Sequence, residues 1–359
     1  MILKKKFHNK KLYKKILPLL LVLSMCLLSG CGQKEGDQTK AGFSAIGESD
    51  YDTAMQCFQA AIDEGEDAEL AYRGIGMTYL GMAQYDEAVD AFETALSNGG
   101  LFAGDLERDI NFYMATALYK NGNYTRAGEL LDVIIKSQKN NVDAHFLRGC
   151  VALETDDYEN GIYHFDKAIE NSKDQQSMKI RVFEELASNG YEDKGSEYLT
   201  GILDDGSKLS DYEQGVVYFY LKDYDSARNH LGLAKQSDTK NAGNIVYMLG
   251  KTYEQLGEYN YASVLYTEYL QDHKGDANIY NQLGICQLKL DDAASAIKSF
   301  ESGLELGNTA MTQILKYNQI CAYEQATDFD KAKTLLDEYL AAYPDDEAAQ
   351  REAVFLSTR

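Results

Sequence analysis

The chain has 359 residues, and its 57 acidic side chains outnumber the 35 basic ones to give a formal net charge of −22. Such an acidic surface repels phosphate groups, which argues against nucleic-acid binding and against adhesion to a membrane through a basic patch. Only two prolines occur. Because an interior proline costs a helix about 3 kcal/mol, this scarcity favours a chain that is almost entirely helical.

The first thirty residues differ from the rest. Seven lysines between Lys4 and Lys15 precede an apolar run of thirteen residues from Ile16 to Leu28, which is too short to cross a bilayer and is typical of a signal peptide. The run ends in Leu28-Ser29-Gly30-Cys31, which resembles the lipobox of bacterial lipoproteins. The resemblance implies transfer of diacylglycerol to Cys31 and cleavage of residues 1–30. An ordinary signal peptide with a chance cysteine is the alternative.

Membrane attachment is expected through this lipid alone, because no second apolar stretch approaches eighteen residues. Cleavage removes seven lysines and no acidic residue, which leaves 28 basic and 57 acidic side chains and a net charge near −29. Residues 31–41 are expected to form a flexible tether that reaches roughly 17 Å by random-coil scaling. The predicted location is therefore the extracytoplasmic side of the cell membrane, with the folded part close to the head groups.

From residue 42 onward one pattern recurs nine times. A mostly small residue is followed twelve positions later by a second one, and a large apolar residue comes four positions after that. The residues at the second position are Ala54, Ala88, Ala127, Gly161, Lys194, Ala227, Ala262, Ala296 and Ala332, at intervals of 33 to 39 residues. A period of this length indicates a solenoid of stacked supersecondary units.

One copy, residues 69–102, shows what the pattern requires. Apolar residues recur at helical spacing over residues 70–80 and again over residues 85–96, with a turn between the two runs. We expect two antiparallel helices whose backbones approach closely where Gly76 faces Ala88.

The pattern resembles the tetratricopeptide repeat, which has a small residue at its eighth position, Ala at its twentieth and an aromatic residue near its seventeenth. The resemblance covers residues 35 to about 345. It implies an all-α fold, a right-handed α-solenoid of antiparallel helix pairs with about eight or nine repeats over residues 42–345, and a capping helix over residues 346–359. The copy with Val182 and Lys194 at its small positions departs most. Its helices are expected either to pack less tightly or to be shifted in register by one residue.

Residues that could carry chemistry do not form a catalytic motif. Four cysteines lie in different repeats without a CxxC pair: Cys57, Cys150, Cys286 and Cys321. A disulfide between Cys286 and Cys321 and buried free thiols are the two alternatives. His145 and His164 fall on the two helices of one repeat, but a metal-binding or pH-sensing role needs neighbours that the sequence does not identify. We expect no enzymatic activity, no metal and no cofactor.

Binding is expected on the first helix of each repeat, because in the family that these repeats resemble the first helices line a concave face. Carried over position by position, the resemblance implies an aromatic groove formed by Phe112, Tyr119, Phe146, Phe183, Tyr212, Phe219, Tyr220 and Tyr247, with Leu153 and Leu186. Farther along, the implied lining turns polar at Lys251, Glu254, Asn278, Asn281 and Lys289. Aromatic, largely uncharged surfaces suit apolar anchors of a peptide or partner helix. The alternative is that several of these rings serve only helix packing.

The leading hypothesis is a membrane-anchored, extracytoplasmic scaffold that binds a protein or peptide on this face, without nucleic acid. A more specialised assembly factor for a cell-envelope or polymer-export machine is the second hypothesis. An enzyme with an unrecognised site is the third.

Overall fold

The computed structural model describes residues 36–99, 104–204, 209–238, 242–307 and 309–359, and within these ranges all regular structure is α-helical. The predicted signal peptide and the predicted lipidation site Cys31 lie outside the described residues. The chain forms two compact units, of which unit 1 ends at Ile202 and unit 2 begins at Leu203.

Unit 1 is built from α2 (Asp37–Gly47), α3 (Tyr51–Asp63), α4 (Ala68–Gly81), α5 (Tyr85–Asn98), α6 (Asp105–Lys120), α7 (Tyr124–Ser137), α8 (Val142–Glu154), α9 (Tyr158–Asn171), α10 (Gln175–Ser188) and α11 (Glu192–Asp204). Unit 2 is built from α12 (Asp211–Tyr220), α13 (Tyr224–Ser237), α14 (Ala242–Gln255), α15 (Tyr259–Asp272), α16 (Ala277–Lys289), α17 (Ala293–Glu305), α18 (Thr309–Gln325), α19 (Phe329–Ala342) and α20 (Glu347–Leu356).

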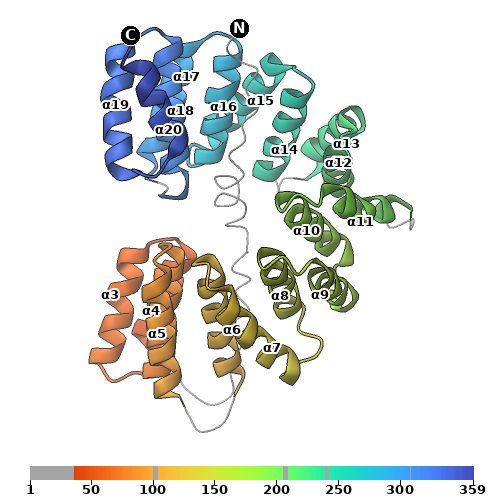
Figure 1. Cartoon of the computed structure of the whole chain (residues 1–359), viewed down its shortest axis with the longest axis vertical. Helices are drawn as coiled ribbons and strands as arrows, with labels where there is room; N and C mark the ends of the chain where they lie inside the picture. The colour runs from red at the N-terminus through yellow and green to blue at the C-terminus, as the bar shows by residue number, and fades with distance from the viewer. Residues whose placement is uncertain (1–35, 100–103, 205–208, 239–241, 308) are drawn as a thin grey trace. The chain divides into compact units, whose positions relative to one another are not determined.

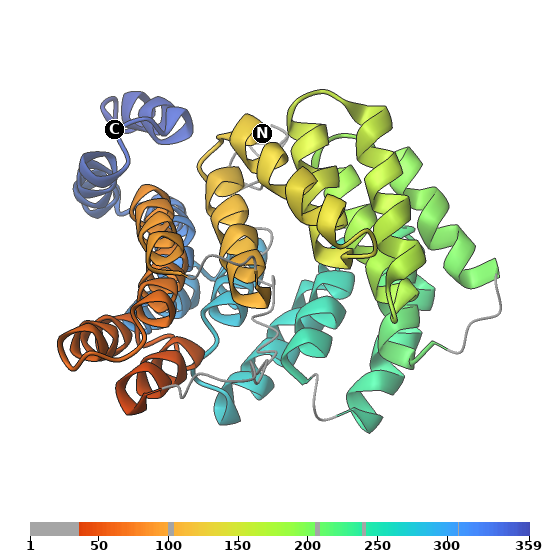
Figure 2. The ribbon, with the colours of Figure 1, turned by 90° about the horizontal axis from the view of Figure 1, so that it is seen from below.

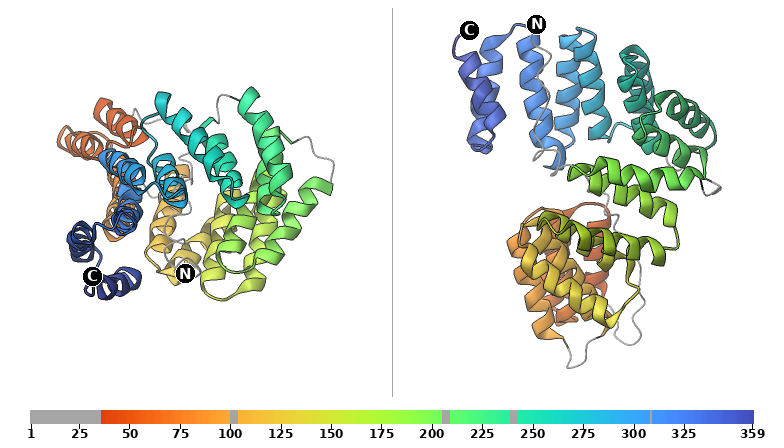
Figure 3. Two further views of the ribbon diagram at one scale, coloured as in Figure 1. Left: turned by 90° about the horizontal axis from the view of Figure 1, so that it is seen from above. Right: turned by 45° about the vertical axis from the view of Figure 1, so that its right-hand side comes forward.

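Within each unit, consecutive helices form antiparallel pairs that stack in chain order (Figures 1 and 2). First helices of successive pairs also contact each other, as α2 does with α4, α4 with α6 and α6 with α8 in unit 1. The same holds for α12 with α14 and for α16 with α18 in unit 2. Figure 3 shows the short turns that join the two helices of a pair. One pair cannot bury both of its faces, so this stacking supplies the core.

The close helix contact predicted from the small residues is present. A Cβ atom built on Gly76 would lie 2.5 Å from a ring carbon of Phe92, and one built on Gly149 would lie 2.6 Å from the ring of Phe165. Both rings are fully buried, as is Ala88. Each glycine therefore leaves the space that a large ring from the partner helix fills.

Aspartate residues in the turns before helices cap the helices that follow. Asp157 caps α9 by accepting a hydrogen bond from the Asn160 backbone N–H, and Asp346 caps α20 by accepting from Ala348 and Ala349. These carboxylates satisfy N–H groups that the first turn of a helix leaves without an intrahelical partner.

The predicted tether extends too far into the chain. Helix α2 begins at Asp37, and Thr39 is fully buried. The Glu66 carboxylate, from the loop between α3 and α4, accepts hydrogen bonds from the backbone of Gln38 and Thr39 and from the Thr39 hydroxyl, at 3.0, 2.9 and 2.6 Å. The predicted boundary at residue 41 is therefore wrong: residues 37–41 belong to the first repeat, because a carboxylate from the following loop caps their helix.

The repeat with Val182 and Lys194 is shifted by one residue. Gly195, not Lys194, is buried, and a Cβ atom built on it would lie 3.3 Å from the Phe183 backbone. Four residues later Leu199 is fully buried, whereas Lys194 points to solvent and pairs with Glu197 at 2.5 Å. Of the two alternatives, the register shift is the correct one.

Helix α20 lies within the predicted capping segment 346–359. Ala349 and Leu356 of α20 join Ile320, Leu336 and Tyr339 in a buried cluster that closes the last helix pair. In the part of the chain that the structure describes, no helix is both long enough and apolar enough to span a bilayer.

Candidate partner-binding surface

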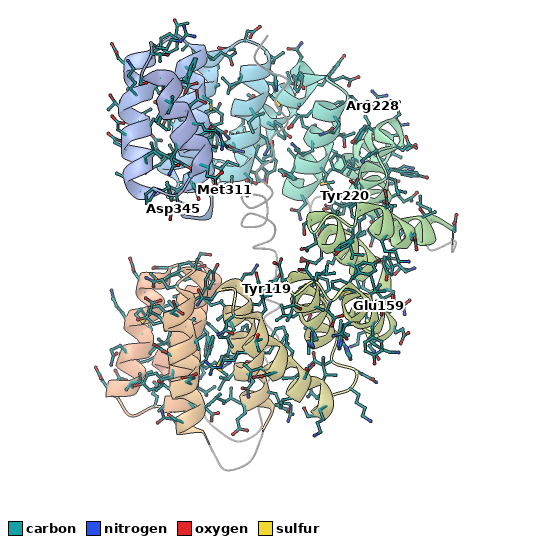
Figure 4. The ribbon with its side chains drawn as sticks, in the orientation of Figure 1. Tyr119, Glu159, Tyr220, Arg228, Met311 and Asp345 are labelled. Carbon is teal, nitrogen blue, oxygen red and sulfur yellow. The ribbon has the colours of Figure 1, made fainter. Side chains whose placement is uncertain are left out.

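In unit 1, two of the predicted aromatic residues lie on α6 in half-buried positions. Phe112 packs edge-to-face with Tyr113, their ring centres 6.2 Å apart, and Tyr119 contacts Tyr124 at 5.8 Å. Lys120 lies 5.7 Å from the centre of the Tyr119 ring. Tyr119 is labelled in Figure 4. These rings are held by neighbours yet keep part of their surface free, as an anchoring site for an apolar side chain requires.

Phe146 on α8 is more deeply placed. It is 9% exposed, its ring lies 5.6 Å from Phe165, and the Arg181 guanidinium of α10 covers it at 4.3 Å. Only the edge of this site, where Arg181 meets the ring, can reach a partner. Such a cation–π contact contributes about 0.5–1 kcal/mol at an exposed site.

Phe183 does not belong to the surface. The one-residue register shift turns it toward Gly195, and it is only 3% exposed. Leu186 and Leu153 are also buried. The prediction that Phe183 lines a groove is therefore wrong, and its physical cause is the register shift.

Side chains from the neighbouring first helices α8 and α10 lie close to Tyr119. Burial, followed by the nearby Cys150 and Glu185, raises the pKa of the Tyr119 hydroxyl. Burial, followed by Glu185, also raises the pKa of the Cys150 thiol, which is partly offset by Arg181 and Lys120. Both groups therefore stay protonated at neutral pH, and the Cys150 thiol is a poor nucleophile.

Unit 2 presents its predicted aromatic residues on α12 and α14. Tyr212, Phe219, Tyr220 and Tyr247 are all half-buried. Phe219 contacts Tyr220 at 5.6 Å and Tyr224 at 5.7 Å, both edge-to-face. Figure 4 labels Tyr220 at the C-terminal end of α12. These four aromatic residues of unit 2 therefore lie on the first helices α12 and α14.

Of the polar residues predicted farther along unit 2, Lys251 and Glu254 form an ion pair with each other. The Lys251 ammonium lies 2.8 Å from Glu254 Oε2, and the Tyr266 hydroxyl donates to Glu254 Oε1 at 2.8 Å. Asn281, 1% exposed, accepts a hydrogen bond from the Asn318 amide at 2.8 Å. Asn281 was expected on the lining and is instead buried between first helices.

Sequence reasoning missed a cationic contact in the first three repeats. Arg73 on α4 lies 5.2 Å from the Phe43 ring of α2 and 5.5 Å from the Tyr113 ring of α6, and its guanidinium pairs with Asp109 of α6 at 2.5 Å. It therefore joins three successive first helices. The available signal in the sequence was its place on a first helix, three residues before the small residue Gly76.

The four cysteines in the described part of the chain do not form a disulfide. Cys57, Cys150, Cys286 and Cys321 are all free thiols, so the alternative of a bond between Cys286 and Cys321 is not realised. Among the described residues, no group of three or more His, Cys, Asp or Glu side chains is placed to hold a metal ion.

Comparison with known proteins agrees with this geometry. Models of the tetratricopeptide repeat match residues 73–141, 112–175 and 316–346. The fold is that of the tetratricopeptide repeat. The predicted all-α repeat solenoid is thereby confirmed, and no enzyme family is indicated.

Relatives with this repeat share only part of their length with the chain. DnaJ homolog subfamily C member 7 of Homo sapiens is 32% identical over 130 residues, 33% of this chain and 25% of that protein. The Mus musculus protein is 30% identical over 130 residues, 34% of this chain and 25% of its own length. The chain thus spans about a quarter of the curated relatives it matches.

Similar solved structures are more distant in sequence. A tetratricopeptide repeat protein from Parabacteroides merdae is 14% identical with a TM-score of 0.44, covering 79% of this chain and 97% of that one. The human IFIT1 dimer with m7Gppp-AAAA is 14% identical with a TM-score of 0.45, covering 90% and 86%.

Proposed function

We propose that this chain is a membrane-anchored, extracytoplasmic scaffold that binds a protein or peptide partner through the first helices of its repeats. The observation that carries the proposal is the set of half-buried aromatic rings at repeated positions of first helices: Phe112 and Tyr119 in unit 1, and Tyr212, Phe219, Tyr220 and Tyr247 in unit 2. Rigid, partly exposed rings provide contact area at low entropic cost.

The surface chemistry favours a protein partner. Carboxylates such as Glu154 and Glu185 lie beside the aromatic residues of unit 1, and the chain as a whole is strongly acidic. A partner segment with apolar anchors flanked by basic residues fits this environment, whereas a phosphate backbone is repelled.

Anchoring is proposed through lipid on Cys31. The capped start of α2 at Asp37 leaves only residues 32–36 between the lipidated cysteine and the first helix. Even when fully extended, this segment spans at most about 20 Å. The lipid would therefore hold the first repeat near the membrane and raise the local concentration of the scaffold for partners at the same surface.

Chemical cross-linking in intact cells, followed by affinity capture and mass spectrometry, tests the binding proposal. The double substitution Phe112→Ala/Tyr220→Ala should remove the cross-linked partner, while the matched pair Tyr163→Ala/Tyr261→Ala, at rings 54% and 65% exposed on second helices, should not. Equal capture by both double variants, with unchanged helical circular dichroism, argues against binding on the first helices.

Anchoring is tested separately with Cys31→Ser. This substitution should abolish incorporation of a labelled fatty acid and move the protein from the membrane to the soluble fraction. Membrane retention without label would contradict the lipid anchor. Recovery of stoichiometric subunits of an envelope or export machine would favour the more specialised assembly role.

A further inference from the structure

Two buried histidines join the helices α8 and α9 of one repeat. His145 and His164 are 3% and 7% exposed, and their Nδ1 atoms lie 2.9 Å apart. His145 Nε2 lies 3.0 Å from the Lys139 carbonyl oxygen. Because a carbonyl can only accept, His145 carries its proton on Nε2, and its Nδ1 accepts the hydrogen bond that His164 Nδ1 donates.

This arrangement requires neutral imidazoles. One added proton keeps a hydrogen bond between the rings but buries a full positive charge. A second proton gives both Nδ1 atoms an N–H, which breaks the hydrogen bond and sets two cations against each other. The contact between α8 and α9 is thus strongest when neither ring is charged.

The groups that face the pair come from all three helices packed around it. Burial, the Arg148 guanidinium of α8 and His145 lower the pKa of His164 to about 4, with Asp132 of α7 and Asp157 of α9 opposing them. Arg148 and Asp132 are themselves paired at 2.9 Å, which reduces the attraction that Asp132 offers the ring. The Tyr163 ring, 5.1 Å away, covers the other side of His164.

Unit 2 contains the same geometry with a different partner. His230 of α13 and Asp211 of α12 are nineteen positions apart, as are His164 and His145, and His230 Nδ1 lies 3.2 Å from Asp211 Oδ1. There a carboxylate stands where His145 stands in unit 1.

We propose that the His145–His164 pair is an acid-sensitive latch that holds α8 against α9 while both rings are neutral and loosens this contact on protonation. The pair is linked to Phe146, because Phe146 follows His145 on α8 and packs on Phe165, which follows His164 on α9. Provided that the proposed partner binding holds, acidification weakens binding to unit 1 by disturbing Phe146.

Amide hydrogen exchange of the full mature chain at pH 7.5 and pH 5.0 tests the latch without any partner. The pKa of His164 is about 4 in the folded protein and about 6.5 when it is unfolded. Because of this difference, the equilibrium constant for opening of α8 and α9 should rise about 30-fold at pH 5.0, after correction for intrinsic exchange. The double variant His145→Leu/His164→Leu should lack this rise. An equal rise in both proteins overturns the proposal.

A second variant keeps the test decisive if the leucine pair disturbs folding. His145→Asp recreates the Asp211–His230 arrangement, so protection of α8 and α9 should increase on acidification. A fall as large as that of the wild type overturns the latch. Partner capture at the two pH values is scored independently: loss at pH 5.0 in the wild type but not in the leucine variant supports regulation, whereas equal capture at both pH values refutes it. A failure of partner binding itself leaves the exchange result unaffected.

Discussion

Replacing Glu324 by Gln is expected to stabilise the C-terminal end of unit 2 at neutral and alkaline pH. Glu324 of α18 is hydrogen-bonded to Glu352 of α20, and its Oε1 atom is buried without a partner among the described atoms. Burial, followed by repulsion from Glu352, raises the pKa of Glu324 to about 8. A contact between two carboxyl groups therefore joins α20 to α18.

The pH dependence of the free energy of unfolding follows from the difference between the folded and unfolded pKa values of Glu324. Because the folded pKa lies above the unfolded value of 4.5, the contribution of this carboxyl to stability is fully present below pH 4.5 and is lost as pH rises through about 8. Glutamine stays neutral, and its amide can donate to Glu352 at every pH. The gain at pH 9 is expected to be about 2 kcal/mol, smaller than the full pKa shift implies, since the side chain is partly exposed.

The chain supplies a matched control at the equivalent position of α14. Glu254, like Glu324, lies four residues after the small position of its repeat, but it has Lys251 and the Tyr266 hydroxyl as partners at 2.8 Å. The corresponding neighbours of Glu324 are Cys321 and Leu336. Glu254→Gln weakens charge-assisted hydrogen bonds and should destabilise the fold by about 1–2 kcal/mol.

Urea denaturation at pH 6 and pH 9, combined with hydrogen exchange of α18 to α20, measures both effects. Glu324→Gln should raise protection of α20 at pH 9, with a smaller gain at pH 6. Destabilisation by Glu324→Gln at pH 9, or the same sign for both substitutions, would refute the reasoning.

Three further outcomes follow from the packing. Gly195→Leu should destabilise unit 1 by about 1–3 kcal/mol through overpacking, whereas Lys194→Leu should change the free energy of unfolding by less than about 0.5 kcal/mol; equal effects in thermal unfolding would contradict the register shift. Gly76→Ala should also destabilise, because its Cβ atom meets Phe92 at 2.5 Å, and an unchanged melting temperature would count against this close approach. Cys150 should resist alkylation at pH 8 until the protein unfolds, since burial raises its thiol pKa, and rapid labelling of the native protein would show that it is accessible.

The repeat architecture could be predicted because its determinants are local and periodic. Gly76 and Ala88 recur with their ring partner at fixed spacing, so sequence alone locates the contact between paired helices. The register of the repeat around Lys194 was predicted wrongly because Gly195, one position later, makes the close helix contact. One aberrant repeat has no periodicity of its own that would reveal the shift. That error then placed Phe183 on the surface, although the structure buries it.

Contacts between side chains on different helices could not be predicted from the sequence. His145 could not be assigned a partner until α8 and α9 brought His164 within 2.9 Å, and Glu324 meets Glu352 only because α20 folds back on the last pair. The start of α2 was missed for a similar reason, since its cap Glu66 comes from the following loop. Each case depends on a side chain from another helix or loop, which local pattern does not reveal.

Site-specific photo-cross-linking in intact cells tests partner binding by the first helices most directly. A photoreactive aromatic residue is placed in turn at Phe112 and Tyr220 on first helices and at Tyr163 and Tyr261 on second helices. If the first helices bind the partner, we expect a discrete protein adduct from the first-helix positions and none from the second-helix positions. Adducts of the same protein from all four positions, or from the second helices alone, would contradict it.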